Sequence, residues 1–191
     1  MKKIILIALV LFTLTSCSNN SNDRNKSAES PGVESDENQD TVYYGDYQMG
    51  PDDFNHLIKN NPIDKDHDLE FREFDGSEEF STGNWIQLEN KYYDIWEHEM
   101  NATLSKLKLK LNKEEVELLE ETQREWESYH LNENKFVTTA FLEKDYFGSQ
   151  GYVSSTIIAT SRVRERTIKL MEYYYVLNHY QLEFDYKGKY K

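Results

Sequence analysis

The sequence comprises 191 residues with a formal net charge of −13 and a single cysteine. The length predicts one folded domain with extensions, and the cysteine count excludes an intramolecular disulfide and a cysteine-based metal site. The acidity argues against nucleic acid as a partner, because binding nucleic acid requires clustered Lys and Arg.

The first 17 residues have the pattern of a bacterial lipoprotein signal peptide. Lys2 and Lys3 precede an apolar stretch, Ile4 to Leu14, that ends in the lipobox Leu14-Thr15-Ser16-Cys17. The stretch is too short to span a membrane. We expect cleavage before Cys17 and lipidation of that cysteine, palmitate included. The protein would then be anchored in the cell envelope, on the extracytoplasmic side of a bacterial membrane. An ordinary secretory signal with an incidental cysteine is the alternative.

Residues 18–40 are predicted to form a disordered tether. They contain one aliphatic residue larger than Ala, Val33, so they lack the apolar surface that offsets chain entropy on folding. Residues 18–84 hold 17 acidic and 5 basic residues, a net charge of −12, whereas residues 85–191 carry only −3. A cationic protein partner is compatible with this distribution, and simple solubility is the alternative.

Residues 41–84 are predicted to be an acidic, partly ordered extension. A short helix is expected at 52–59, ended by Asn60-Asn61-Pro62. The alternating aspartates that follow resemble the start of a calcium-binding EF-hand loop, which gives a weak calcium candidate formed by Asp64, Asp66 and Asp68. Leu69 stands where that loop requires Gly and Asp75 where it requires Glu, so a plain acidic loop is the competing interpretation.

Three long helices are predicted after this extension. The first covers 84–111, with Ser81 or Thr82 as its cap. The second begins at Lys113 behind an Asn112 N-cap, where Glu115 can complete a capping box. Apolar residues continue its stripe past Tyr129, and a break is possible near 131–134. The third helix is expected from Ser154 or Ser155 to about Asn178, after a turn at 145–151.

These elements predict an all-α fold, an antiparallel bundle of three long helices, with the second either continuous or broken. The helical domain would span residues 85–180, followed by a C-terminal tail at 181–191 that packs as an extended segment or frays.

The helical region resembles the LprI-type lysozyme-inhibitor family over residues 92–177. The matching features are Met100-Asn101, the pattern L-x-x-x-Q-x-x-W at Leu119, Gln123 and Trp126 with Tyr129 after it, the Gly148-Ser149 turn, and Arg166-Thr167 with Leu170. The resemblance implies a small helical domain of an exported bacterial protein that inhibits a lysozyme or related muramidase. Members commonly carry cysteines near the positions of Asn134 and Ile158, and this chain has none there.

The family-motif residues are interpreted mainly as structural. Trp126 lies on the helix stripe and is assigned to the core. Gln123 and Arg166 are expected to form a polar link between the second and third helices, with a pair that recognises a partner as the alternative. Asn101, Tyr129 and Thr167 complete the motif set. The candidate partner-binding element is the turn with the residues Asp145, Tyr146, Phe147, Ser149 and Tyr152.

No catalytic set is recognisable in the sequence. No two histidines have metal-ligand spacing, and Ser149 does not fit a nucleophile elbow. We therefore expect a non-enzymatic binding protein that needs no cofactor, with a cationic lysozyme as the partner that the resemblance implies. The alternative is a non-catalytic envelope adaptor or structural lipoprotein that binds another envelope protein.

Overall fold

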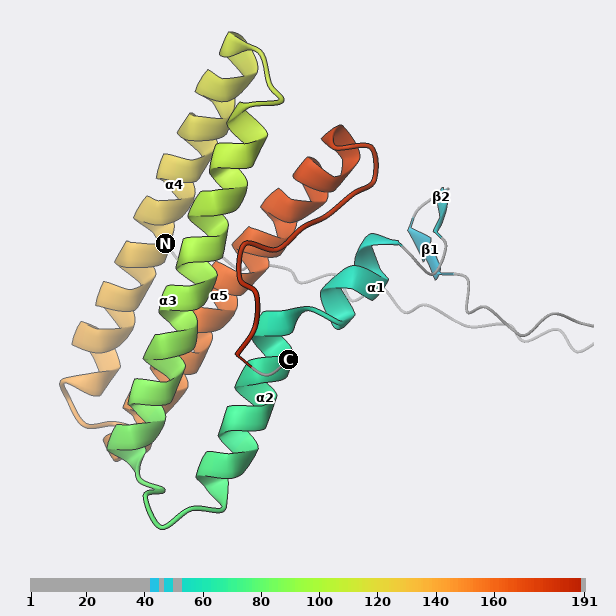
Figure 1. The fold of residues 1–191 in the computed structure, drawn as a ribbon. Coiled ribbons are helices and arrows are strands. Elements are labelled where there is room, and N and C mark those ends of the chain that lie inside the picture. The colour runs from blue at the N-terminus through green and yellow to red at the C-terminus, as the bar shows by residue number, and fades with distance from the viewer. Residues whose placement is uncertain (1–41, 45–46, 50–52, 190–191) are drawn as a thin grey trace, which may run out of the picture. The chain divides into compact units, whose positions relative to one another are not determined.

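The computed structural model describes residues 42–44, 47–49 and 53–189. The predicted signal peptide, the lipidated Cys17 and the tether at 18–40 lie outside these residues. Two short strands, β1 (Val42–Tyr44) and β2 (Tyr47–Met49), form an antiparallel hairpin in which Val42 pairs with Met49 and Tyr44 with Tyr47. The rest of the described chain is helical apart from its connections and its tail (Figure 1).

Two shorter helices precede the long ones. Helix α1 (Phe54–Lys59) begins at Asp53, whose carboxylate accepts the His56 N–H at 2.9 Å. Helix α2 (Pro62–Asp75) begins at Asn61, and Pro62 occupies its first turn, where a missing N–H costs nothing. The predicted helix at 52–59 is thus present, but the segment 62–75 is a helix rather than the expected acidic loop.

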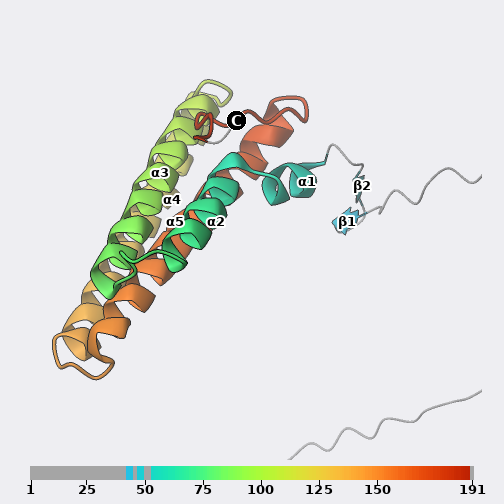
Figure 2. The same ribbon diagram turned by 60° about the horizontal axis from the view of Figure 1, so that its bottom comes forward.

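Helices α3 (Thr82–Lys108) and α4 (Lys113–Val137) run side by side in opposite directions (Figures 1 and 2). Ser81 caps α3 by accepting the Asn84 N–H. At the start of α4 the Asn112 side chain accepts the Glu115 N–H at 3.1 Å, and the Glu115 carboxylate accepts the Asn112 N–H at 2.8 Å. The capping box predicted from sequence is therefore confirmed.

Helix α4 does not break at 131–134 but continues to Val137 and passes into a π-helix, η1 (Thr138–Leu142). Helix α5 (Gly148–Leu177) follows and makes the most extensive helix–helix contact of the described fold, with α3. Thr160 and Thr167 let the two backbones approach closely: the Thr167 hydroxyl lies 3.3 Å from the Trp96 carbonyl, and the Thr160 hydroxyl 3.5 Å from the Glu89 carbonyl.

The main core lies where α2, α3 and α5 meet. Its fully buried side chains include Ile63 from α2, Tyr92, Trp96 and Leu107 from α3, and Leu170 from α5. Each such side chain contributes roughly 1.5–3 kcal/mol through burial of apolar surface. The prediction of a helical fold is confirmed, whereas a bundle of three long helices is an incomplete description because α2 is part of the same core.

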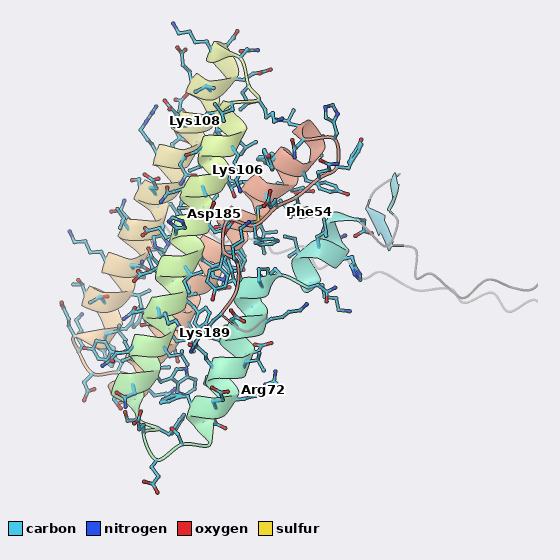
Figure 3. All side chains as sticks on the ribbon, viewed as in Figure 1. Phe54, Arg72, Lys106, Lys108, Asp185 and Lys189 are labelled. Atoms are coloured by element: carbon cyan, nitrogen blue, oxygen red, sulfur yellow. The ribbon has the colours of Figure 1, made fainter. Side chains whose placement is uncertain are left out.

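The C-terminal tail, residues 181–189, packs on the helices. The Glu99 carboxylate on α3 is fully buried and accepts the backbone N–H groups of Asp185 and Tyr186 at 2.9 and 2.8 Å. The Tyr186 hydroxyl donates to Asp66 on α2 at 2.8 Å. Asp185 and Lys189 mark the course of this segment between α3 and α2 (Figure 3). Of the two outcomes expected for the tail, packing as an extended segment is the one observed.

Within the described residues, no helix is both long enough and apolar enough to cross a bilayer.

Candidate functional site

The connection between α4 and α5 is the candidate functional site because it presents a cluster of exposed aromatic side chains. We call this cluster the aromatic tip and define it as Phe136, Phe141, Tyr146 and Phe147. The Phe141 ring is half-buried and lies 5.7, 6.3 and 5.9 Å from the rings of Phe136, Tyr146 and Phe147. Those three side chains are 56%, 66% and 59% exposed, so the tip is an apolar surface open to a partner.

The backbone of the tip is held in place by close packing. Asp145 and Gly148 both adopt the left-handed conformation, with φ of 57°. A side chain at Gly151 would place its Cβ 2.7 Å from the Phe147 Cβ and 3.0 Å from a Leu142 methyl group, so only glycine fits there. Leu142 is 5% exposed and anchors the turn in the bundle. The turn is therefore a defined structure that displays aromatic rings at its surface.

The predicted partner-binding residues come together here, but not all of them lie in the turn. Asp145, Tyr146 and Phe147 precede α5, whereas Ser149 and Tyr152 belong to its first two turns. Tyr152 is 43% exposed, and its hydroxyl lies 3.4 Å from the Leu142 carbonyl. Helix α5 thus begins about six residues before the predicted start at Ser154 or Ser155. Phe136 and Phe141 were not predicted as part of the site, because they were assigned to the apolar stripe of the second helix.

A hollow lies beside the tip on the outer side of α4 and η1. Its volume is about 410 Å³, and it is lined by Asn132, Lys135, Phe136, Thr139, Ala140 and Lys144. The two lysines place positive charge next to an exposed aromatic ring. The surface around the tip therefore combines apolar contact area with groups that can pair with a carboxylate.

Gln123 and Arg166 form the polar link predicted between α4 and α5. Arg166 Nε donates to the Gln123 side-chain oxygen at 3.0 Å, and the Gln123 amide donates to Glu127 at 3.0 Å. Burial lowers the pKa of the Arg166 guanidinium, and its Nη2 is buried with no hydrogen-bond partner among the described residues. The pair is an internal connection between helices, in agreement with the structural interpretation of the motif.

A second polar link surrounds His130, which lies two turns after Gln123 on the same buried face of α4. His130 is 3% exposed, and its Nε2 lies 3.1 Å from the Tyr93 hydroxyl and 3.1 Å from the Asn134 amide nitrogen. Arg162 of α5 reaches Nδ1 at 3.4 Å and also donates to the Asn134 side-chain oxygen. Burial, and then the charge of Arg162, lower the pKa of His130. His130 was noticeable in the sequence as a polar residue on the core-facing stripe, but its partners were not predictable.

The other motif residues occupy mixed environments. Trp126 is half-buried and stacks on the His130 ring at 5.2 Å, rather than lying fully in the core. Thr167 is fully buried and donates to the Val163 carbonyl at 2.8 Å. Asn101 is exposed on α3, and Tyr129 is 56% exposed on α4. The structure therefore supports a packing role for Thr167 and shows none for Tyr129.

The calcium interpretation of Asp64, Asp66 and Asp68 is wrong, because the three residues lie on helix α2 and not in a loop. The Asp64 carboxylate is bound by Arg164 of α5, with contacts of 2.6 to 3.0 Å, and the Asp66 carboxylate by the Tyr186 hydroxyl. Asp68 is exposed. Among the described residues, no three His, Cys, Asp or Glu side chains are grouped so that they could hold a metal ion.

Residues 78–170 match the family model described as "Lysozyme inhibitor LprI". The match covers just under half of the chain, from the middle of the α2–α3 connection to the last third of α5, and includes the aromatic tip and both polar links. It confirms the family resemblance that the motifs predicted, although its bounds differ from the predicted 92–177. No curated protein and no solved structure matches the chain.

Proposed function

We propose that this protein binds and inhibits a lysozyme or related muramidase at the bacterial cell envelope, with the aromatic tip as the element inserted into the enzyme. The observation that carries the proposal is the exposure of Phe136 at the end of α4, and of Tyr146 and Phe147 on the turn before α5, within the segment that matches a lysozyme-inhibitor family. The family match suggests the class of partner, and the tip supplies a surface suited to it.

The tip has the properties of a binding anchor. Exposed aromatic side chains dominate the energetics of many protein interfaces, because they bury a large area at a low cost in side-chain entropy. The conformation of the turn is already set by Gly151 and Leu142, so little ordering is required on binding. A protruding turn of this kind suits a concave enzyme cleft.

Charge adds a long-range contribution. The chain carries a net charge of −13, and its field attracts a cationic lysozyme and increases the association rate at low ionic strength. The proposed lipid on Cys17 would hold the protein at the membrane, with residues 18–40 as a tether, so that inhibition takes place near the cell surface. Inhibition requires no catalytic residues, which agrees with the absence of a recognisable catalytic set in the sequence.

The proposal is tested with the chain from Ser18 to Lys191, the proposed mature protein without its lipidated cysteine. This protein is titrated into c-, g- and i-type lysozymes, and both binding and cell-wall lysis are measured at low and physiological salt. We expect inhibition that persists at physiological salt. Binding that disappears with salt would contradict the proposal, because it would reflect only attraction between opposite net charges.

A variant pair locates the binding surface. Phe147→Ala is expected to weaken binding by roughly 30-fold, since loss of an aromatic anchor costs about 2 kcal/mol. The matched control is Tyr180→Ala, an aromatic residue that is 69% exposed just beyond the other end of the 30-residue helix α5, and it should leave binding unchanged. Equal effects of both variants would contradict a role for the tip. A stable complex with another envelope protein, without any effect on lysozymes, would favour the envelope adaptor.

A further inference from the structure

We propose that His130 is a pH-sensitive latch, which holds α4 and the aromatic tip against α5 at neutral pH and releases them in mildly acidic solution. The loosening of α4 is a property of the fold itself. Its consequence for binding, a weaker hold on lysozyme at acidic pH, rests on the proposed function.

The polar groups around His130 require its ring to accept a hydrogen bond. Arg162 can only donate, and its Nε points at the ring Nδ1 at 3.4 Å. Because Arg162 also donates to the Asn134 oxygen, the Asn134 amide nitrogen is the atom turned toward the ring Nε2. The Tyr93 hydroxyl is the one neighbour that can accept as well as donate. A doubly protonated ring would therefore present an N–H to the guanidinium in a buried position.

The charged groups on the helices packed around His130 also favour a neutral ring. On α5, Arg162 contacts the ring, and Arg166, one turn further along the helix, is bonded to Gln123. On α3 the contact is Tyr93, whose own pKa is raised by burial and by the nearby Glu97 and Asp94. On α4 itself, Glu127 is bonded to Gln123. After burial, the charge of Arg162 is the second cause that lowers the pKa of the imidazole, and it opposes protonation.

Helix α4 is unusually dependent on this contact. Its only buried side chains are Gln123 and His130, both polar, while Val116, Leu119 and Trp126 are half-buried. Since no fully buried apolar side chain holds α4, loss of the His130 contact removes a large share of its attachment. Helix α4 continues through η1 into the tip, so its release also disturbs the surface proposed to bind lysozyme.

The direction of the pH effect follows from the depressed pKa of His130. Above its ordinary pKa of about 6.5 the ring is neutral whether α4 is attached or released, and the contact is intact. Below that value the released form takes up a proton that the attached form resists, so attachment weakens as the pH falls. At pH 5.5, one unit below the ordinary pKa, the population of the released form rises by at most about tenfold, the limit that is reached when the attached ring stays neutral.

Hydrogen exchange detected by mass spectrometry tests the latch in the chain from Ser18 to Lys191 at pH 7.5 and 5.5, with intrinsic exchange rates corrected. We expect α4 amides to lose protection at pH 5.5, by at most about tenfold, while α3 amides change little. His130→Gln should abolish this pH dependence. The control His56→Gln, which alters an exposed histidine on α1, should retain it. Unchanged α4 protection in the wild type, or a persistent pH effect in His130→Gln, would overturn the proposal.

A measurement on the wild-type protein keeps the test independent of any folding defect in the variant. An NMR titration of the histidine rings should show that the pKa of His130 lies below the ordinary value of about 6.5, and a value at or above 6.5 would overturn the latch. Lysozyme binding at both pH values separates the two proposals. Loosening of α4 without any lysozyme binding would leave the latch and reject the proposed function. Lysozyme binding without loosening of α4 would support the proposed function and reject the latch.

Discussion

Helices α3 and α4 are of similar length and both begin with well-formed caps, but they are held by α5 in different ways. Helix α3 buries large apolar side chains against α5, among them Trp96, Met100 and Leu107, around Val163 and Leu170. Helix α4 buries only Gln123 and His130, which bond to arginines of α5. One contact is mainly hydrophobic and the other mainly polar.

This difference shows that the sequence signals for a helix, such as its caps, do not indicate how firmly that helix is packed against the rest of the fold. Asn112 and Glu115 form the capping box, the best start signal in the sequence, yet they introduce the helix with the fewest buried side chains among the three long ones. Apolar burial is insensitive to pH, whereas a buried polar contact responds to protonation. The partner-binding tip is continuous with the more responsive helix.

The largest expected effect is on the free energy of unfolding, when an apolar side chain is removed from the α3–α5 core and, for comparison, from α4. Leu170→Ala, at a fully buried position on α5, should lower the free energy of unfolding by about 3 kcal/mol, because it creates a cavity in the main core. Leu119→Ala, at a half-buried position on α4, should cost about 1 kcal/mol. Urea denaturation followed by circular dichroism measures both. Equal losses of stability would show that α4 is packed as firmly as the core between α3 and α5.

A smaller effect is expected from the bond that joins Gln123 to Arg166. In a double-mutant cycle of Gln123→Ala and Arg166→Ala, the coupling free energy should be about 1 kcal/mol, the net contribution of a typical intramolecular hydrogen bond. The cycle is measured by equilibrium unfolding of the four proteins. A coupling of zero would mean that the hydrogen bond contributes nothing to the attachment of α4, which would then depend on its half-buried apolar residues.

The smallest expected effect concerns His67 of α2, which behaves oppositely to His130. The hydrogen bond to Glu89, at 3.2 Å, raises the pKa of His67 despite its partial burial. The pair therefore contributes its full stability below pH 6.5 and loses it as the pH rises through the raised pKa. When the exchange experiment is repeated at pH 8 and pH 6, α2 amides should show slightly more protection at pH 6, while α4 amides show less. His67→Gln should remove the gain in α2, and a gain that persists would contradict the assignment.

Features that depend on neighbouring residues were predictable. The caps Ser81 and Asn112 belong to this group, because a cap bonds a backbone N–H three residues away. The link between Gln123 and Arg166 is an exception, because the two residues are 43 positions apart, and it was predicted from the stripe of α4 together with the family motif. The turn residues Tyr146 and Phe147 are exposed as expected.

Features that depend on distant residues were missed. The sequence of helix α2 was interpreted as an acidic loop, because the groups that bind its aspartates are far along the chain and were not foreseen. Arg164 is 100 residues from Asp64, and Tyr186 is 120 residues from Asp66. The early start of α5 was missed because Gly148 and Gly151 are typical of a turn. Gly151 is required there by its contacts with Phe147 and Leu142 and not by a turn conformation.

The sequence by itself determined that the chain is helical, where α3 and α4 begin, and that a turn with aromatic residues joins the second and third long helices. Hydrophobic periodicity and capping act over a few residues, so they can be read without a fold. Only the tertiary structure decided that the tail covers Glu99, that α2 joins the core, and that His130 is surrounded by hydrogen-bond donors. These depend on which helix faces meet, because a buried polar group is defined by partners that only the folded chain brings to it.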